Sequence, residues 1–189
     1  MPLDTRVVGY VIDGLWLVFA LYWLAHAMGN KRSVYRQSRT SRLLFLMILV
    51  LLAYVIFHTM PLAVRVLPHT LATQIAGMVL CAAGVAIAIG ARRVLGANWS
   101  GIVTLKEDHE LIRRGPYRFV RHPIYSGVIL AFAGGVVALT PTLQGVAFLV
   151  VLAAGLKLKS LKEEEILGAQ FPEYAQYKRE VKALIPFVL

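Results

Sequence analysis

Hydrophobic residues in this chain are gathered into long, nearly uninterrupted stretches that are separated by polar segments. A helix that crosses the roughly 30 Å hydrocarbon core of a bilayer needs about 20 consecutive apolar residues. Three stretches have about that length, at residues 7–28, 43–64 and 71–91. The pattern therefore predicts three membrane-spanning helices in the first half of the chain.

A fourth apolar stretch runs from Pro123 to Ser160 and is too long for one ordinary crossing. As a single helix rising about 1.5 Å per residue, it would reach roughly 57 Å. The sequence Thr140-Pro141-Thr142 offers a break, because proline lacks a backbone donor and disfavours helix in the residue before it. We therefore expect two helices in a tight hairpin, which completes an all-α, polytopic membrane helix bundle of five transmembrane helices.

The distribution of basic residues gives this bundle an orientation. All but two of the 20 lysines and arginines lie in residues 29–42, 92–122 and 157–189, and the exceptions are Arg6 and Arg65. Basic residues in short loops gather on the cytoplasmic side of a membrane. Loops rich in basic residues alternate with loops poor in them, which predicts an N-terminus outside and a C-terminus in the cytoplasm. A bundle of four helices would instead put two of the basic segments on opposite sides of the membrane.

Composition agrees with a membrane protein and narrows its partners. The chain is 58% hydrophobic and 16% charged, which is far from the balance of a soluble domain. With this orientation, the net charge of +10 lies mostly on the cytoplasmic face, where it should attract anionic membrane lipids. No basic stripe lies on a recognisable nucleic-acid-binding motif, so we expect no nucleic-acid partner.

We expect a single integral membrane domain over residues 1–189, since no internal repeat or low-complexity segment appears. Glycine and alanine are frequent in the third apolar stretch, which favours close helix packing and a central place in the bundle. The single cysteine, Cys81, provides neither a disulfide framework nor a cysteine metal site, and no metal site is predicted.

Polar side chains with useful chemistry stand at the two ends of the expected hairpin. Arg121 and His122 come directly before Pro123, which suits the first turn of a helix, and Tyr125 follows within that turn. An arginine fork matches a carboxylate, and histidine and tyrosine make directed hydrogen bonds. We expect this end of the hairpin to contact a ligand.

Glu163 and Glu164 stand at the other end of the hairpin, one turn beyond Lys159. A carboxylate facing a cavity there can bind an amine, a ribose hydroxyl or a sulfonium. A simpler interpretation is that arginine and histidine contact lipid headgroups, while a KEEE run is a solvated helix face in which Glu163 pairs with Lys159. Because both features lie on one membrane face, a shared site is the sharper hypothesis.

Three motifs occur in order around the hairpin and resemble one enzyme family. They are His109-x-Leu111, the run GPYRFVRHPIYSG at residues 115–127, and Glu163-Glu164-x-x-Leu167, followed by Phe171, Tyr174, Tyr177 and Pro186. This arrangement is similar to the isoprenylcysteine carboxyl methyltransferase family of integral membrane enzymes, which is related more distantly to phospholipid N-methyltransferases. The resemblance covers roughly residues 92–187.

The resemblance implies that the cytoplasmic loop and tail enclose S-adenosylmethionine, with an opening to lipid for an apolar methyl acceptor. It implies that Arg121 and Glu164 are the pair nearest the chemistry. The residues implied to bind the cofactor are His109, Leu111, Gly115, Tyr117, His122, Pro123, Tyr125 and Glu163. The family often has arginine where this chain has Lys159, which cannot make the same bidentate fork.

We therefore expect a methyltransferase whose acceptor is an apolar carboxylate, with a thiol or a lipid amine as alternatives. In this hypothesis Arg121 orients the acceptor, and a thiol or amine would take Glu164 or His109 as its base. Two other classes stay open: an NADPH-dependent membrane reductase of the sterol-reductase type, and a non-enzymatic lipid-binding or transport protein. The short chain favours a prokaryotic cytoplasmic membrane.

Overall fold

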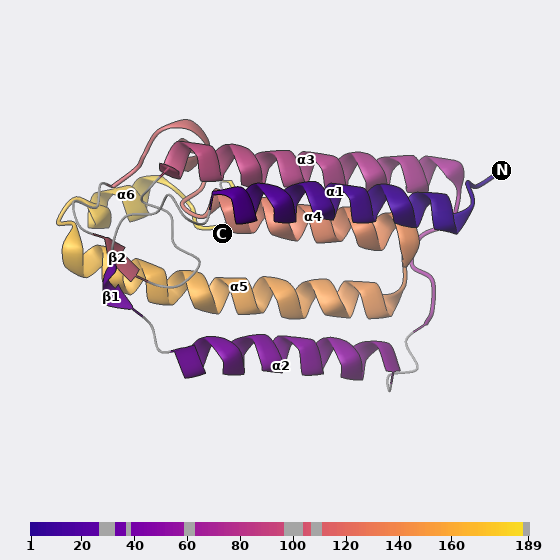
Figure 1. Cartoon of the computed structure of the whole chain (residues 1–189), viewed down its shortest axis with the longest axis horizontal. Helices are drawn as coiled ribbons and strands as arrows, with labels where there is room; N and C mark the ends of the chain where they lie inside the picture. Colours follow the sequence, from indigo (N-terminus) through magenta and orange to yellow (C-terminus); the bar gives the residue numbers. More distant parts are fainter. Residues whose placement is uncertain (27–32, 37–38, 59–62, 97–103, 107–110, 187–189) are drawn as a thin grey trace.

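The computed structural model describes residues 1–26, 33–36, 39–58, 63–96, 104–106 and 111–186. Long helices lie side by side along one direction, as Figure 1 shows. The elements in chain order are α1 (Thr5–Ala25), β1 (Ser33–Arg36), α2 (Arg39–His58), α3 (Leu71–Leu95), β2 (Thr104–Lys106), the short 3₁₀ helix η2 (Gly115–Arg118), α4 (Pro123–Leu139), α5 (Leu143–Gln170) and α6 (Tyr174–Glu180).

The described part is helical apart from one small sheet, which the expectation of an all-α protein did not include. Strands β1 and β2 pair antiparallel and join the segment between α1 and α2 to the segment between α3 and α4. They have only 4 and 3 residues. Such short strands in polar connections produce no readable periodicity, and this is why the sequence did not predict them.

Membrane-helix character is clear for much of the bundle. Within the described residues, α1, α3 and α5 are long and apolar enough to cross a bilayer, and α4 is a shorter apolar helix of 17 residues. Helix α5, with 28 residues, extends beyond its apolar part. Its last turns, from Lys157 onward, carry the charged residues and lie at the same end as α6.

The expected hairpin is present, and its turn falls at the predicted proline. Helix α4 ends at Leu139 and α5 begins at Leu143. Thr142 caps α5, since its hydroxyl accepts a hydrogen bond from the backbone of Gly145 at 3.3 Å. The loop before α3 fixes the turn, because the Val66 amide donates to the Pro141 carbonyl at 2.8 Å.

Helices α3 and α4 are in backbone contact along their small residues. A Cβ atom on Gly77 would lie 2.5 Å from the backbone nitrogen of Ala138, and one on Gly127 would lie 2.6 Å from the carbonyl oxygen of Gly84. The predicted close packing of the third stretch is therefore present. Helix α3 packs against α1, α4 and η2 and is the most buried of the three long apolar helices, whereas α4 packs against α1, α3 and α5.

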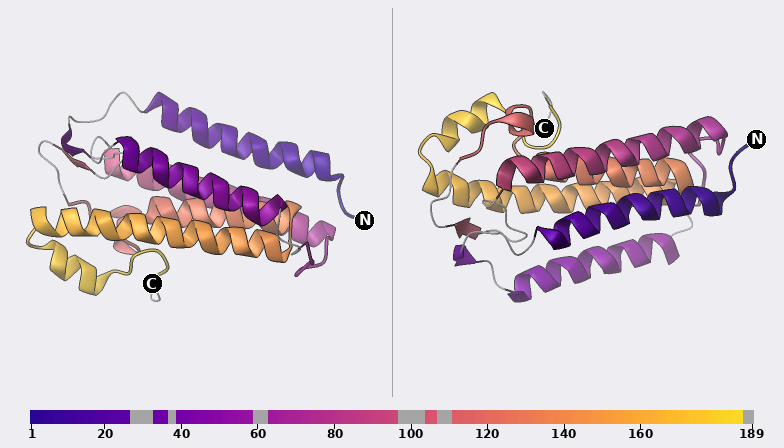
Figure 2. Two further views of the ribbon diagram at one scale, coloured as in Figure 1. Left: turned by 90° about the horizontal axis from the view of Figure 1, so that it is seen from below. Right: turned by 45° about the horizontal axis from the view of Figure 1, so that its top comes forward.

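The polar elements gather at one end of the bundle. Helix α6, the sheet and the C-terminal segment lie at the left in Figure 1, whereas the N-terminus lies at the opposite end. The two rotated views in Figure 2 show the same division. The N-terminal end of α4 and the last turns of α5 meet at this polar end, and together they form the candidate site.

Candidate active site

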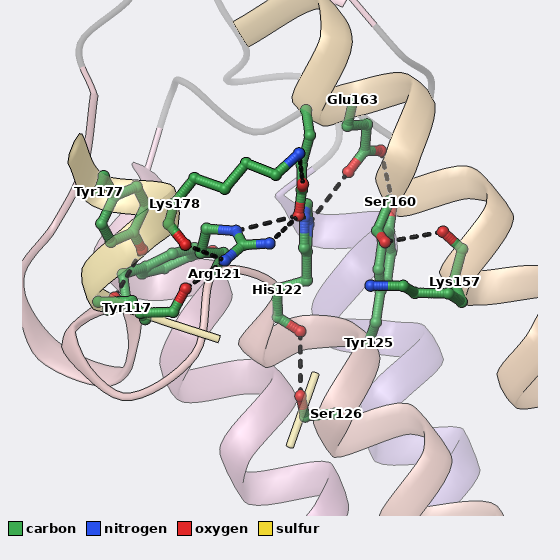
Figure 3. A network of polar contacts seen from close by, with 12 residues as sticks. Tyr117, Arg121, His122, Tyr125, Ser126, Lys157, Ser160, Glu163, Tyr177 and Lys178 are labelled. Carbon is green, nitrogen blue, oxygen red and sulfur yellow. Dashed lines mark hydrogen bonds and ion pairs between the residues drawn. The ribbon is translucent and has the colours of Figure 1, made fainter. Parts of the chain in front are cut away.

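Two short segments that are far apart in sequence meet at the polar end. Arg121 and His122 immediately precede α4, Pro123 occupies its first turn, and His122 is the residue at its N-cap position. Glu164 projects from α5 and is buried, as are Arg121 and His122. The sequence predicted that the two ends of the hairpin would share a site, and the structure brings these side chains into direct contact (Figure 3).

Arg121 and Glu164 form a buried ion pair. The Nη2 and Nε atoms of Arg121 donate to Oε1 of Glu164 at 2.7 and 3.0 Å. The two side chains are only 6% and 2% exposed. A guanidinium and a carboxylate that are both withdrawn from water depend strongly on each other, because either one alone would be a buried, uncompensated charge.

His122 lies between two carboxylates. Its Nε2 atom is 3.1 Å from Oε1 of Glu164, and its Nδ1 atom is 3.5 Å from Oε2 of Glu163. The Tyr125 hydroxyl donates to Oε1 of Glu163 at 2.5 Å, and the Tyr125 ring is stacked parallel to the imidazole. Burial alone would lower the pKa of His122, but the hydrogen bonds and negative charges of Glu163 and Glu164 raise it above its ordinary value.

This pKa direction predicts a pH-dependent contribution of His122 to stability. A histidine whose pKa is raised on folding stabilises the protein fully below its unfolded pKa of about 6.5, and that contribution is lost as the pH rises through the raised value. We expect the stability difference between the wild type and His122→Gln to be largest below about pH 6.5 and to shrink at higher pH. Thermal unfolding at a series of pH values measures it, and a difference that grows with pH would contradict the assignment.

The C-terminal segment binds the same short stretch before α4. The Arg121 amide donates to the Lys182 carbonyl at 2.8 Å, and the His122 amide donates to the Ala183 carbonyl at 3.0 Å. Nη1 of Arg121 donates to the carbonyl of Lys178 at 3.2 Å and also to that of Val181. Arg121 therefore joins α5 to the C-terminal segment, and all three nitrogen atoms of its side chain have acceptors.

Lys178 is a member of the cluster that sequence reasoning missed. Its ammonium lies 3.1 Å from Oε2 of Glu164, although the lysine side chain is 53% exposed and the glutamate only 2%. In the sequence Lys178 was one of several basic residues in the tail, and nothing distinguished it from the others. Only the placement of α6 against α5 reveals its partner.

A small pocket adjoins the ion pair. Its lining includes Leu95, Leu111, Leu167, Tyr117, Tyr174 and Arg121. The Tyr174 hydroxyl lies buried beside the Arg121 guanidinium, and burial raises its pKa, so it remains protonated.

The other residues of the predicted cofactor set are distributed around this centre. Leu111 lies in the pocket wall. Gly115 begins η2 with a φ of 61°, a conformation that favours glycine. Tyr117 is buried, and its backbone carbonyl accepts a hydrogen bond from the Tyr177 hydroxyl at 2.6 Å. His109 lies outside the described residues. Lys159 places its ammonium over the Tyr125 ring, 5.2 Å from the centroid.

The site therefore combines a buried cluster of alternating charges with an aromatic pocket at the end of apolar helices. Within the described ranges, no group of histidine, cysteine, aspartate and glutamate side chains is placed to hold a metal ion. The carboxylates suit a cationic ligand group, and the aromatic and leucine side chains suit a flat apolar one. The surrounding helices bring apolar surface close to both.

A family model, curated relatives and a solved structure connect the chain to one enzyme family. The model of the isoprenylcysteine carboxyl methyltransferase family matches residues 75–169. A rice protein (Oryza sativa subsp. indica) described as a probable protein-S-isoprenylcysteine O-methyltransferase is 33% identical over 116 residues, which are 59% of this chain and 60% of that protein. The chain therefore matches only about 60% of the length of this curated relative.

Two further similarities extend the comparison. Methanethiol S-methyltransferase 1 of Bradyrhizobium diazoefficiens is 38% identical over 72 residues, which are 38% of this chain and 24% of that protein. The solved structure of the eukaryotic intramembrane Ras methyltransferase has a TM-score of 0.54 and 19% identity, and the match covers 80% of this chain and 54% of that one. At this identity the structural match establishes a shared fold.

Proposed function

Because the chain belongs to the isoprenylcysteine carboxyl methyltransferase family, we propose that it transfers a methyl group from S-adenosylmethionine to an apolar acceptor in the membrane. One observation carries the proposal: Arg121, which is paired with the buried Glu164 next to His122 and Glu163, also forms part of the wall of an aromatic pocket at the polar end of membrane helices. We propose a carboxylate as the acceptor, in line with the rice relative described as a probable protein-S-isoprenylcysteine O-methyltransferase.

The residues present fit this methyl donor. When bound, S-adenosylmethionine supplies an electrophilic methyl group on a positively charged sulfur. Glu163 and Glu164 provide negative charge for a cationic ligand, and both carboxylates are held in place by hydrogen bonds. Tyr117, Tyr174 and Tyr177 line the pocket and offer aromatic surface to the flat adenine ring. We assign the donor to this pocket and to the adjoining carboxylates.

The protein's work in such a reaction is mainly to position the reactants and exclude water. Methyl transfer is an in-line displacement, so alignment contributes much of the rate enhancement. A carboxylate acceptor is already ionised at neutral pH and needs no base. The near-complete burial of Arg121 and Glu164 keeps water away from this part of the site.

Arg121 and Glu164 are the proposed pair nearest the chemistry, with a refined role for the arginine. Its donors already bind Glu164 and the carbonyls of Lys178 and Val181. We therefore assign to Arg121 the task of holding Glu164 and the C-terminal segment in position, in addition to its expected electrostatic effect on the acceptor. A thiol or amine acceptor would require a base, for which His109 and Glu164 are the candidates.

The membrane arrangement that accompanies this proposal is a single domain with five crossings in a prokaryotic cytoplasmic membrane. The basic segments favour a cytoplasmic site and C-terminus, with the N-terminus outside. Cysteines introduced at Arg65 and Lys182 in a Cys81→Ala background provide the check. A membrane-impermeant maleimide should label position 65 and not position 182 on intact cells, and the reverse labelling would reject the orientation.

Donor binding is the first experimental test of the proposed function. Calorimetry on protein in lipid nanodiscs should detect S-adenosylmethionine binding that weakens at least tenfold in His122→Ala and Glu163→Gln, about 1.4 kcal/mol or more. Glu165→Gln, which changes the exposed neighbour of these carboxylates, is the matched control. Binding of NADPH and not of S-adenosylmethionine would instead support a reductase. Undiminished binding of S-adenosylmethionine in both variants would reject this site.

A further inference from the structure

The two oxygen atoms of Glu164 have very different surroundings. Oε1 accepts two hydrogen bonds from Arg121 and lies 3.1 Å from Nε2 of His122. Oε2 is buried, and among the described residues its contact is the ammonium of Lys178 at 3.1 Å. One oxygen is thus saturated by buried partners, and the other depends on a single flexible side chain.

Lys178 can leave this carboxylate more easily than Arg121 and His122, its other two partners. Its side chain is 53% exposed, whereas those of Arg121 and His122 are 6% and 7% exposed. A lysine ammonium is a strongly hydrated point charge on a flexible stem, so water can readily replace its partner. Water cannot take this role for Glu164, whose side chain is 2% exposed. Burial alone would raise the pKa of its carboxyl, but hydrogen bonds from His122 and Arg121 lower it, so the group stays ionised inside the protein. Arg121, which binds Oε1 of this carboxylate, is part of the pocket wall, so a cationic group of a ligand in the pocket can reach Glu164 if Lys178 moves away.

We propose that the Lys178 ammonium competes with the positively charged sulfur of the methyl donor for Oε2 of Glu164. Lys178 is then a residue that sets the specificity of the site, since it determines how strongly the charged donor is preferred over the uncharged thioether left after transfer. When the positive charge on sulfur is gone, Lys178 pairs again with Oε2, and this favours release of the thioether. The inference rests on the proposed function, because it assumes that a sulfonium donor enters this site.

The test compares two ligands that differ in the charge on sulfur, S-adenosylmethionine and S-adenosylhomocysteine. Lys178→Met keeps an unbranched apolar stem but removes the charge. We expect the affinity ratio of S-adenosylmethionine to S-adenosylhomocysteine to rise about fivefold or more in Lys178→Met, because one competing unit charge at this distance is worth more than that in a partly buried site. Calorimetry with protein in nanodiscs of uncharged lipid gives both affinities.

Two further variants separate this competition from other roles of the lysine. Arg179→Met removes an equal charge from the exposed neighbour of Lys178 on α6 and should leave the ratio unchanged. Lys178→Arg restores a cation and should return the ratio toward the wild-type value. If Lys178→Met changes both affinities by one factor, or lowers the ratio, Lys178 acts only as a structural contact or binds a group common to both ligands, and the proposal is overturned. Wild-type protein that binds neither ligand would overturn the proposed function, and this inference with it.

Discussion

Replacing Glu164 with glutamine is expected to lower the free energy of unfolding by about 3 kcal/mol or more, because the substitution removes one partner of a buried ion pair. The guanidinium of Arg121, only 6% exposed, would lose its counter-charge. His122 and Lys178 would lose the same carboxylate. Denaturant unfolding of the protein in detergent micelles or bicelles measures the change.

The neighbouring Glu165→Gln is the matched control, since Glu165 is exposed and one position away on the same helix. Exposed substitutions of this kind usually change stability by no more than about 0.5 kcal/mol. Arg121→Met should destabilise the protein as Glu164→Gln does, and the pair Arg121→Met with Glu164→Met should cost less than the sum of the single substitutions. Equal stability of Glu164→Gln and Glu165→Gln would show that the cluster does not hold the polar end together.

A methyl group added to Gly84 is expected to force α3 and α4 apart. A Cβ atom at this position would lie 2.5 Å from the carbonyl oxygen of Gly127, and backbone atoms of α4 cannot move aside as a side chain does. Overpacking of this kind costs about 1–3 kcal/mol, and backbone contact places Gly84→Ala at the upper end of that range. The measurement is thermal or denaturant unfolding, with methyl donor affinity as a second readout.

Gly90→Ala provides the comparison within the same helix. A Cβ atom there meets nothing within 4 Å, so alanine should be neutral or stabilise the helix by up to about 1 kcal/mol. Because Arg121 and His122 immediately precede α4, displacement of α4 by Gly84→Ala should also weaken donor binding. A Gly84→Ala protein as stable as Gly90→Ala would mean that the helices are not packed as closely as described.

The positions of the helices along the chain could be predicted because the signals that determine them are local in the sequence. Apolar stretches of membrane length specify helices, and Pro141 with its flanking threonines specifies the turn between α4 and α5. The relative places of the helices were less readable. Small residues show that α3 approaches a partner closely, but they do not show which helix that partner is, and in the structure it is α4.

The candidate site was predictable where a motif ties residues together along the chain. Arg121, His122 and Tyr125 share one helix start, and Glu163 and Glu164 share one turn of α5, so a single contact between the two segments assembles all five. Lys178 could not be predicted in this way. Its role depends on the position of α6, and its signal in the sequence is one lysine in a basic tail.

The sequence could not predict the backbone contacts of the C-terminal segment, for a different reason. The carbonyls of Val181, Lys182 and Ala183 accept hydrogen bonds from Arg121 and His122, and any residue type supplies a carbonyl group. No side-chain pattern marks such a role. The family resemblance included this part of the chain but gave no indication that it binds the stretch immediately before α4.

Methyl transfer itself is the most direct measurement of the central claim. Protein in lipid nanodiscs would be incubated with methyl-labelled S-adenosylmethionine and one of three apolar acceptors that end in a carboxylate, a thiol or an amine. We predict labelled, solvent-extractable ester from the carboxylate acceptor, and its loss in Glu164→Gln under conditions where that protein remains folded. Protein that binds the donor and yields no labelled product from any of the three acceptors would contradict the assignment of this site to methyl transfer.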